Sequence, residues 1–277
     1  MNAGSSDKPI KDASTVILLR RGEEGVETFM VCRHQKSGFM GGAHVFPGGK
    51  LDDEDLSDAW AKHIDGDERT IQKRLGESDP ARSRGLLVAG VRETFEEAGV
   101  LLGQTSNEVD LEDARGRLHG GSAFLSLADE MALRIDAMSL TPYARWVTPE
   151  FESRRFDTRF YVTVVPDDQD ASHDGSETTS ATWLRPSVAI DRMRSGDIKL
   201  APPTVRTLAW LAGFGETGAV LEDARSRTPP LVRPKVVTGG DGWFLALPGD
   251  PEHPESERAL PGATRMVLDG AAWIDVP

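Results

Sequence analysis

Three glutamates on one predicted helix constrain this chain more than any other feature. Residues 91–100 read Val-Arg-Glu-Thr-Phe-Glu-Glu-Ala-Gly-Val, so Glu93, Glu96 and Glu97 fall at i, i+3 and i+4, which are neighbouring positions on a helix surface. Like charges so placed destabilise a helix by about 0.2–0.5 kcal/mol per pair. Gly99 predicts the helix C-terminus, where the helix dipole disfavours each anion by about 0.3–1 kcal/mol. A bound Mg²⁺ or Mn²⁺ would reverse both effects, because hard cations prefer oxygen ligands.

A solvated charged face, on which Arg92 pairs with Glu96, is the alternative interpretation of this helix. The upstream sequence weakens it. Residues 41–52 form a strand-like run that contains the pair Gly48 and Gly49, and glycine permits the backbone to approach a ligand closely. A glycine-rich loop combined with an acidic helix favours a binding site.

The predicted helix also has an apolar side. Asp79 followed by Pro80 is typical of a helix start. Gly90 would weaken the helix, and we expect it to let the Gly48–Gly49 loop approach. Opposite the acids, an apolar stripe at helical spacing is formed by Leu87, Val88, Val91 and Phe95.

Together these segments resemble the Nudix hydrolase family, whose signature reads Gly-x5-Glu-x7-Arg-Glu-U-x-Glu-Glu-x-Gly-U, with U a bulky aliphatic residue. Gly49 matches the opening glycine, and the second half is matched by Arg92, Glu93, Glu96, Glu97, Gly99 and Val100. Thr94 occupies a position that is usually aliphatic, and Asp55 that of the first glutamate. About 36 residues separate Asp55 from Arg92, so the signature is interrupted by an insertion at about residues 56–84.

The resemblance implies a divalent cation, Mg²⁺ or Mn²⁺, with Glu96 and Glu97 as ligands and Glu93 as a ligand or general base. Arg92 would orient one of these glutamates through a charge-assisted hydrogen bond, and Gly49 would contribute its backbone to the metal site. Asp55 is expected to have a structural role and is not assigned to the metal. Family members often add an acid from outside the signature; the first candidate is Glu177, and weaker candidates are Glu150 and Glu152.

The reaction implied by the resemblance is hydrolysis of a phosphoanhydride in a nucleoside diphosphate linked to another moiety. The long insertion is similar to that of one branch of coenzyme A diphosphatases, so coenzyme A or an acyl-CoA is the expected substrate. Expected substrate contacts are Gly48, Gly49, Arg154, Arg155 and His44, although exposed charges and a structural histidine are the alternatives for the last three. Other candidate functions are hydrolysis of ADP-ribose, dinucleotides or nucleotide sugars, and an inactive Nudix-fold binding or regulatory protein.

Composition limits the partners. The formal net charge of −13 argues against a general binder of nucleic acid or anionic membranes. The chain of 277 residues has no apolar run near the roughly 20 residues that span a membrane. The single Cys32 excludes an intramolecular disulfide, fits a reducing compartment and is expected to be a small core residue. We therefore expect a cytoplasmic protein.

Alternating strand and helix patterns predict a mixed α/β chain, and the resemblance implies an α/β/α sandwich with a mixed sheet. We expect a disordered tail over residues 1–13, a Nudix domain over 14–221 and a β-rich extension over 222–277 that packs on the core or forms a homodimer contact. Expected strands cover residues 14–20, 27–33, 145–148, 156–165, 179–184, 235–238, 243–247, 265–268 and 272–276. Besides the acidic helix, helices are expected within 56–75 on the surface and at 122–138, 186–195 and 202–213.

Overall fold

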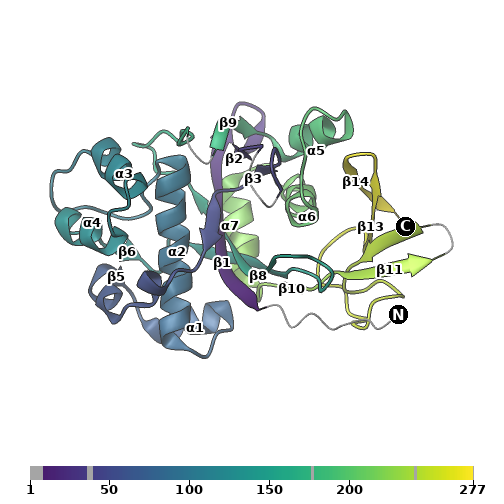
Figure 1. Cartoon of the computed structure of the whole chain (residues 1–277), viewed down its shortest axis with the longest axis horizontal. Helices are drawn as coiled ribbons and strands as arrows, with labels where there is room; N and C mark the ends of the chain where they lie inside the picture. The colour runs from purple at the N-terminus through teal and green to yellow at the C-terminus, as the bar shows by residue number, and fades with distance from the viewer. Residues whose placement is uncertain (1–8, 36–39, 176–177, 240–241, 277) are drawn as a thin grey trace.

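The protein is described by a computed structural model that covers residues 9–35, 40–175, 178–239 and 242–276. In this part of the chain an eight-stranded mixed sheet lies between two layers of helices (Figure 1). Its strands in spatial order are β10 (Leu231–Val232), β7 (Thr141–Val147), β8 (Arg155–Val164), β1 (Ile10–Gly22), β2 (Gly25–Arg33) and β3 (His44–Val45), while β4 (Gly48–Lys50) pairs with β1 and β9 (Thr178–Leu184) with β2. The β1–β8 and β10–β7 pairs are parallel and the other pairs antiparallel, which confirms the mixed sheet.

Strand β1 supplies both hydrophobic cores, because successive side chains of a strand point to opposite faces. Val16 and Leu18 pack into the core on one face, and Ile17 and Leu19 into the core on the other. The first core contains side chains of α1 (Glu68–Leu75), α2 (Pro80–Ala98), α3 (Leu111–His119) and α4 (Phe124–Met131), and the second those of α5 (Pro186–Arg194), α6 (Pro202–Leu211) and α7 (Thr217–Ser226). The two helical layers confirm the α/β/α sandwich (Figure 1).

Helix α2 has the expected ends. The Asp79 side chain accepts a hydrogen bond from Ala81 N at 2.9 Å, and Gly99 adopts the left-handed conformation at the C-cap with φ of 70°. The whole predicted apolar stripe is buried. The expectation for Gly90 is wrong: a Cβ there would lie 3.2 Å from Leu140, with β1 next nearest, so this glycine serves the packing of α2 on the sheet.

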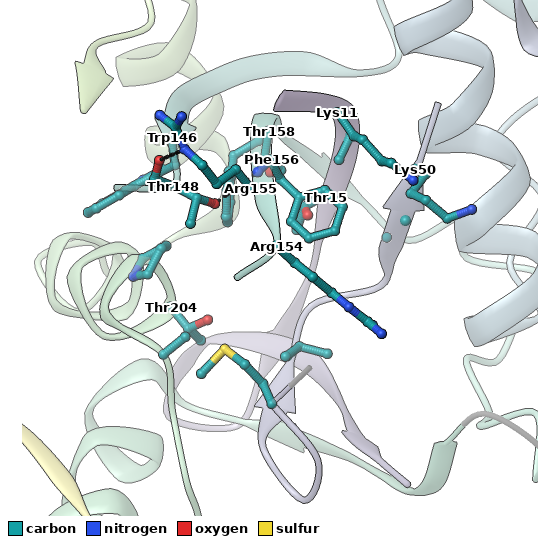
Figure 2. Close-up of a pocket in the computed structure, with 18 of the residues that line it drawn as sticks. Lys11, Thr15, Lys50, Trp146, Thr148, Arg154, Arg155, Phe156, Thr158 and Thr204 are labelled. Atoms are coloured by element: carbon teal, nitrogen blue, oxygen red, sulfur yellow. Dashed lines mark hydrogen bonds between the residues drawn. The ribbon is translucent and has the colours of Figure 1, made fainter. Parts of the chain in front are cut away.

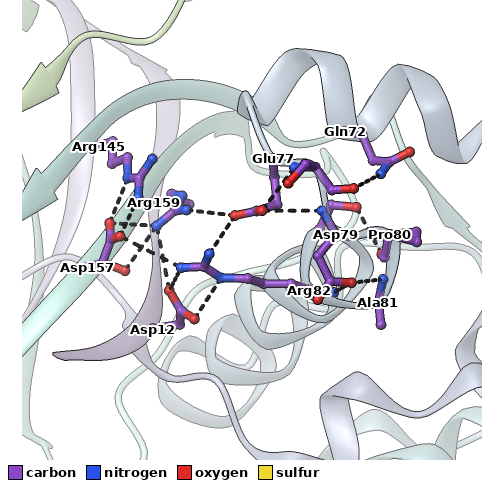
Figure 3. A network of polar contacts seen from close by, with 12 residues as sticks. Asp12, Gln72, Glu77, Asp79, Pro80, Ala81, Arg82, Arg145, Asp157 and Arg159 are labelled. Atoms are coloured by element: carbon purple, nitrogen blue, oxygen red, sulfur yellow. Dashed lines mark hydrogen bonds and ion pairs between the residues drawn. The ribbon is translucent and has the colours of Figure 1, made fainter. Parts of the chain in front are cut away.

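A network of buried and half-buried charges fixes the start of α2 against the sheet (Figure 3). Arg82 of α2 donates to both carboxylate oxygens of Asp12 in β1, at 2.6 and 2.8 Å. Arg82 also contacts Glu77 at 3.0 Å, and Glu77 in turn accepts from Arg159 of β8 at 3.2 Å. Asp157 completes the network by pairing with Arg159 and with Arg145 of β7. These pairs set the position of the helix that carries the glutamates.

The insertion is less superficial than expected. After η1 (Asp53–Leu56), it forms a second short 3₁₀ helix, η2 (Asp58–His63), then β5 (Ile64–Asp65) and α1. Trp60 is fully buried and packs against Phe124 of α4 with ring centroids 5.3 Å apart. The helix expected at 122–138 is confined to α4, because β6 (Ile135–Asp136) follows it and pairs with β5. Helix α3 was not predicted.

Both outer boundaries need correction. Strand β1 begins at Ile10, so residues 10–13 belong to the sheet and not to a tail; residues 1–8 lie outside the described residues. At the other end, α7 crosses the expected boundary at 222 and β10 joins the main sheet. The separate antiparallel sheet consists of β11 (Lys235–Gly239), β12 (Gly242–Ala246), β13 (Arg265–Asp269) and β14 (Ala272–Val276), as the sequence predicts.

Two smaller points concern Cys32 and the membrane. Cys32 was expected in the core, but it is half-buried near the end of β2, with its sulfur 3.8 Å from the carbonyl oxygen of Gly42. Among the helices of the described residues, none combines the length and the apolar character needed to cross a membrane.

Candidate active site

The last two turns of α2 bring the three predicted glutamates against the glycine loop. Glu97 is buried, and one of its carboxylate oxygens accepts a hydrogen bond from the backbone N–H of Gly48 at 2.9 Å. Glu93 lies so close to Gly49 that a Cβ on this glycine would be 2.3 Å from the carboxyl carbon. Only glycine therefore leaves room for the Glu93 carboxylate at this point of the loop.

Arg92 connects this acidic face to the start of the insertion. Its guanidinium donates to Glu93 Oε1 at 2.8 Å, to the carbonyl oxygen of Lys50 at 3.0 Å, and to both oxygens of Asp55 at 2.8 and 3.0 Å. The expected contact between Arg92 and a glutamate is thus present. Asp55, at the position that departs from the family signature, is the bidentate partner of this arginine.

The solvated-face interpretation does not fit this geometry. Arg92 Nη1 is 3.8 Å from Glu96 Oε2, but Glu93, Glu96 and Glu97 all line one cavity, and Glu97 is only 4% exposed. Burial raises the pKa of Glu93 to about 7; Arg92 opposes the rise, and Glu96 and Asp55 add to it. Gathering these carboxylates is unfavourable for ionisation, and a cation beside them would favour the charged form.

The oxygen donors of the glutamates and the glycine loop are the ligand type that a hard divalent cation prefers. Within the described residues, no three Asp, Glu, His or Cys side chains already surround a common point as metal ligands do. The three carboxylates nevertheless line one wall, and the glycine loop beside them offers backbone oxygens with no side chain in the way.

The cavity has a volume of about 1150 Å³ and extends well beyond the glutamates. In Figure 2, Lys11 and Lys50 lie on one side, Trp146 and Thr204 lie on the other, and Arg154 extends between them. Six basic side chains of the described residues line it: Arg92 beside the glutamates, and Lys11, Arg33, Lys50, Arg154 and Arg155. The cavity can therefore hold a molecule with several phosphates away from the cation ligands.

The structure brings some of the predicted substrate contacts to the cavity. Arg154 and Arg155 both line it, and Arg155 Nε donates to the carbonyl oxygen of Thr148 at 3.4 Å. The contact expected for His44 stays a prediction, because the described residues that line the cavity do not include it. Burial, together with Arg192 of α5, lowers the pKa of His44, which places the ring in a desolvated and positively charged surrounding.

The acid expected from outside the signature is tested only in part. Glu177 lies outside the described residues. Of the two weaker candidates, Glu152 lines the cavity, whereas Glu150 is not part of the described lining. Asp174 also lines it and accepts a hydrogen bond from Thr178 N at 2.9 Å. The sequence indicated that the polar loop with Asp174 lies near the site, but gave no reason to select this aspartate from its neighbours.

Comparisons with known proteins agree with this geometry. The NUDT19 Nudix domain matches residues 10–211. The acyl-coenzyme A diphosphatase NUDT19 of Gallus gallus is 29% identical over 276 residues, which cover 83% of this chain and 73% of that protein. The Homo sapiens protein of that name is 29% identical over 270 residues, covering 82% and 72%. A crystal structure of a NUDIX hydrolase from Alicyclobacillus acidocaldarius superposes with a TM-score of 0.65 at 25% identity, covering 81% of this chain and 99% of that one.

Proposed function

This chain belongs to the Nudix hydrolase family, in the group described by the NUDT19 Nudix domain, and we propose that it hydrolyses the phosphoanhydride of coenzyme A and of acyl-CoA esters. One water is consumed, one P–O bond of the diphosphate is cleaved, and two phosphate monoesters leave. The products are 3′,5′-ADP and phosphopantetheine or its acylated form. The observation that carries the proposal is the acidic face of α2 against the glycine loop, in a cavity that six basic side chains of the described residues also line.

The proposed cation is Mg²⁺ or Mn²⁺, held by Glu93, Glu96, Glu97 and the backbone of Gly49. When bound, it neutralises the phosphates and activates a water for attack. Arg92 keeps Glu93 in place, because Asp55 and the Lys50 carbonyl fix the guanidinium on its other sides. The Gly48 N–H holds Glu97 in the same way. Two of the three acids are therefore held beside the glycine loop before substrate arrives.

The choice of coenzyme A rests on the long insertion, on the names of the vertebrate relatives and on the basic side chains that line the cavity. Coenzyme A has a diphosphate and a separate 3′-phosphate, so it needs positive groups at more than one place. Lys50 directly follows Gly49, whereas Arg155 is the first residue of β8 and Arg154 directly precedes that strand. We propose that Lys50 contacts the diphosphate and that the two arginines contact the remaining phosphate.

The proposal is tested by product chromatography after incubation with coenzyme A, decanoyl-CoA, ADP-ribose, NADH and a nucleotide sugar, each with Mg²⁺ or Mn²⁺. Rapid turnover of another substrate without turnover of coenzyme A or decanoyl-CoA would refute the substrate. The site is tested by Glu97→Gln, with exposed Glu23→Gln as the matched control. We expect kcat to fall by about 10²–10³ for Glu97→Gln only, with thermal stability in EDTA unchanged or raised. Full activity of Glu97→Gln would refute the site.

A further inference from the structure

One face of the C-terminal sheet carries a row of apolar side chains, with the polar residues Thr238 and Asp275 on its two outer strands. Residues opposite each other in antiparallel strands share a face, and the pairs Leu245–Met266 and Leu268–Trp273 put these side chains together with Trp243, two residues before Leu245. We call these five residues the aromatic face. Leu245 and Met266 are buried in the core, Trp273 is half-buried, and Trp243 is 43% exposed. The face thus runs from the core to the surface.

The aromatic face is continuous with the cavity that holds the glutamates. Leu245 and Trp273 line the cavity, and so does Phe151 from the β7–β8 loop. Trp243 packs between the other two rings, with centroids 5.7 Å from Trp273 and 6.5 Å from Phe151. Phe151 is 56% exposed although it belongs to this cluster. Exposed aromatic side chains gathered at the rim of a cavity indicate a binding surface.

The sheet is fixed against the rest of the protein. Arg206 of α6 is 3% exposed and donates to the Asp275 carboxylate in β14 and to the carbonyl oxygen of Pro261. Leu245, Met266 and Leu260 share a core with residues of α5, α6 and α7. In Figure 1 this sheet lies at the end of the molecule away from α1–α4. Leu245 and Trp273 are therefore a preformed part of the cavity wall, and Trp243 extends this surface through its ring contact with Trp273.

We propose that the aromatic face binds the acyl chain of acyl-CoA and sets a preference for acylated over free coenzyme A. This inference rests on the proposed function. The glutamates and basic groups can hold the diphosphate, and Leu245 and Trp273 line the same cavity. An acyl-CoA carries its apolar chain at the end of the molecule away from its nucleotide. An acyl chain would cover Trp273, Trp243 and Phe151, which free coenzyme A leaves in water.

The test compares decanoyl-CoA with coenzyme A, which differ only in the acyl group. We expect the wild type to have a kcat/KM at least about tenfold higher for decanoyl-CoA, and Trp273→Ala and Trp243→Ala to lose most of this ratio while turnover of coenzyme A stays within about twofold. The matched control is Phe244→Ala, which removes an aromatic ring from the opposite face of the same strand, where Arg265 stacks on it at 4.0 Å. We expect it to keep the wild-type ratio.

Calorimetric titration of both compounds into the protein in EDTA gives a second measurement that does not depend on turnover. We expect decanoyl-CoA to bind at least about tenfold more tightly than coenzyme A, and the two tryptophan variants to lose this difference. Equal effects on both compounds, or an unchanged ratio, would overturn the proposal. So would variants that change only the oligomeric state in light scattering, because the face would then be a contact between two copies. Failure to hydrolyse either compound would refute the proposed function, whereas turnover of both with unaltered ratios refutes only the acyl-binding face.

Discussion

Replacing Asp55 should test whether this aspartate is the structural support of the active-site arginine. Asp55 is 1% exposed and Arg92 is 8% exposed, and two charge-assisted hydrogen bonds join them. The same carboxylate accepts from the backbone N–H of Asp52 at 2.9 Å. Asp55→Ala removes all three bonds and leaves a buried guanidinium with fewer partners.

The expected loss follows from these contacts. Breaking a buried pair by removing one partner costs about 3–5 kcal/mol. Arg92 keeps Glu93 and the Lys50 carbonyl, so the lower end of this range applies to the pair. We expect the free energy of unfolding to fall by about 3 kcal/mol and the melting temperature by roughly 6–12 °C. Because Arg92 would then be less well fixed, we expect kcat to fall by about 10–100-fold as well.

Urea unfolding and calorimetry in EDTA measure the stability, and turnover of the preferred substrate measures the activity. The matched control is Asp53→Ala in the same 3₁₀ helix, whose side chain is exposed and whose loss should change stability by at most about 0.5 kcal/mol. A double-mutant cycle with Arg92→Met should give a double variant that is less destabilised than the sum of the two single variants. If Asp55→Ala and Asp53→Ala melt at the same temperature, the role assigned to Asp55 is refuted.

Three further predictions concern neighbouring residues. Gly49→Ala should lower kcat by about 10²-fold with little change in melting temperature, because its Cβ would displace the Glu93 carboxylate. Gly48→Ala should unfold at lower temperature, since its Cβ would lie 2.4 Å from the backbone oxygen of Ser14. Equal melting temperatures of the two variants would contradict this prediction. Burial opposes ionisation of Asp157, but Arg145 and Arg159 outweigh this effect and hold the pKa of Asp157 below its usual value. The stability that the ionised carboxylate contributes is therefore present above pH of about 4 and is lost as the pH falls further. The melting temperature of Asp157→Asn should differ from that of the wild type most near neutral pH, and the two should converge in acid. His44→Gln should leave kcat/KM within about twofold, because the described cavity lining does not include His44; a larger loss would return this histidine to the site.

Local patterns predicted those parts of the site that a single element determines. The i, i+3, i+4 spacing of the glutamates and the cap residues of α2 predicted one helix with two faces, and the structure has it. The strands of the C-terminal sheet were also predicted from local sequence, since each is a short strand-like run between Gly and Pro turns. Helix α4 was predicted too long, because Leu133 and Ile135 continue its apolar pattern although they pack from an extended segment.

Long-range contacts could not be predicted from such patterns. Nothing near Asp55 indicates that it would pair with Arg92, because the two are brought together by β4 and α2 in three dimensions. His44 stands four residues before Gly48 in sequence, but the alternation of β3 turns it away from the cavity that Val45 lines. The aromatic face was equally hidden, since residues 243 and 273 become neighbours only through the pairing of β12 to β14.

The contact between Asp55 and Arg92 also explains how the signature tolerates an insertion of this length. Lengthening the connection from the 7 residues of the family signature to about 36 costs roughly 1.5 kcal/mol of loop-closure entropy, because that cost grows only with the logarithm of length. Burial of Ile71 and Leu75 contributes about 1.5–3 kcal/mol each, and Trp60 is buried beside them. Burial of these side chains therefore offsets the closure cost of the insertion. The pair Arg92–Asp55 joins the chain before the insertion to α2 after it, and the pair Arg82–Asp12 joins the start of α2 to β1. The length of the insertion can change without moving the glutamates relative to the glycine loop.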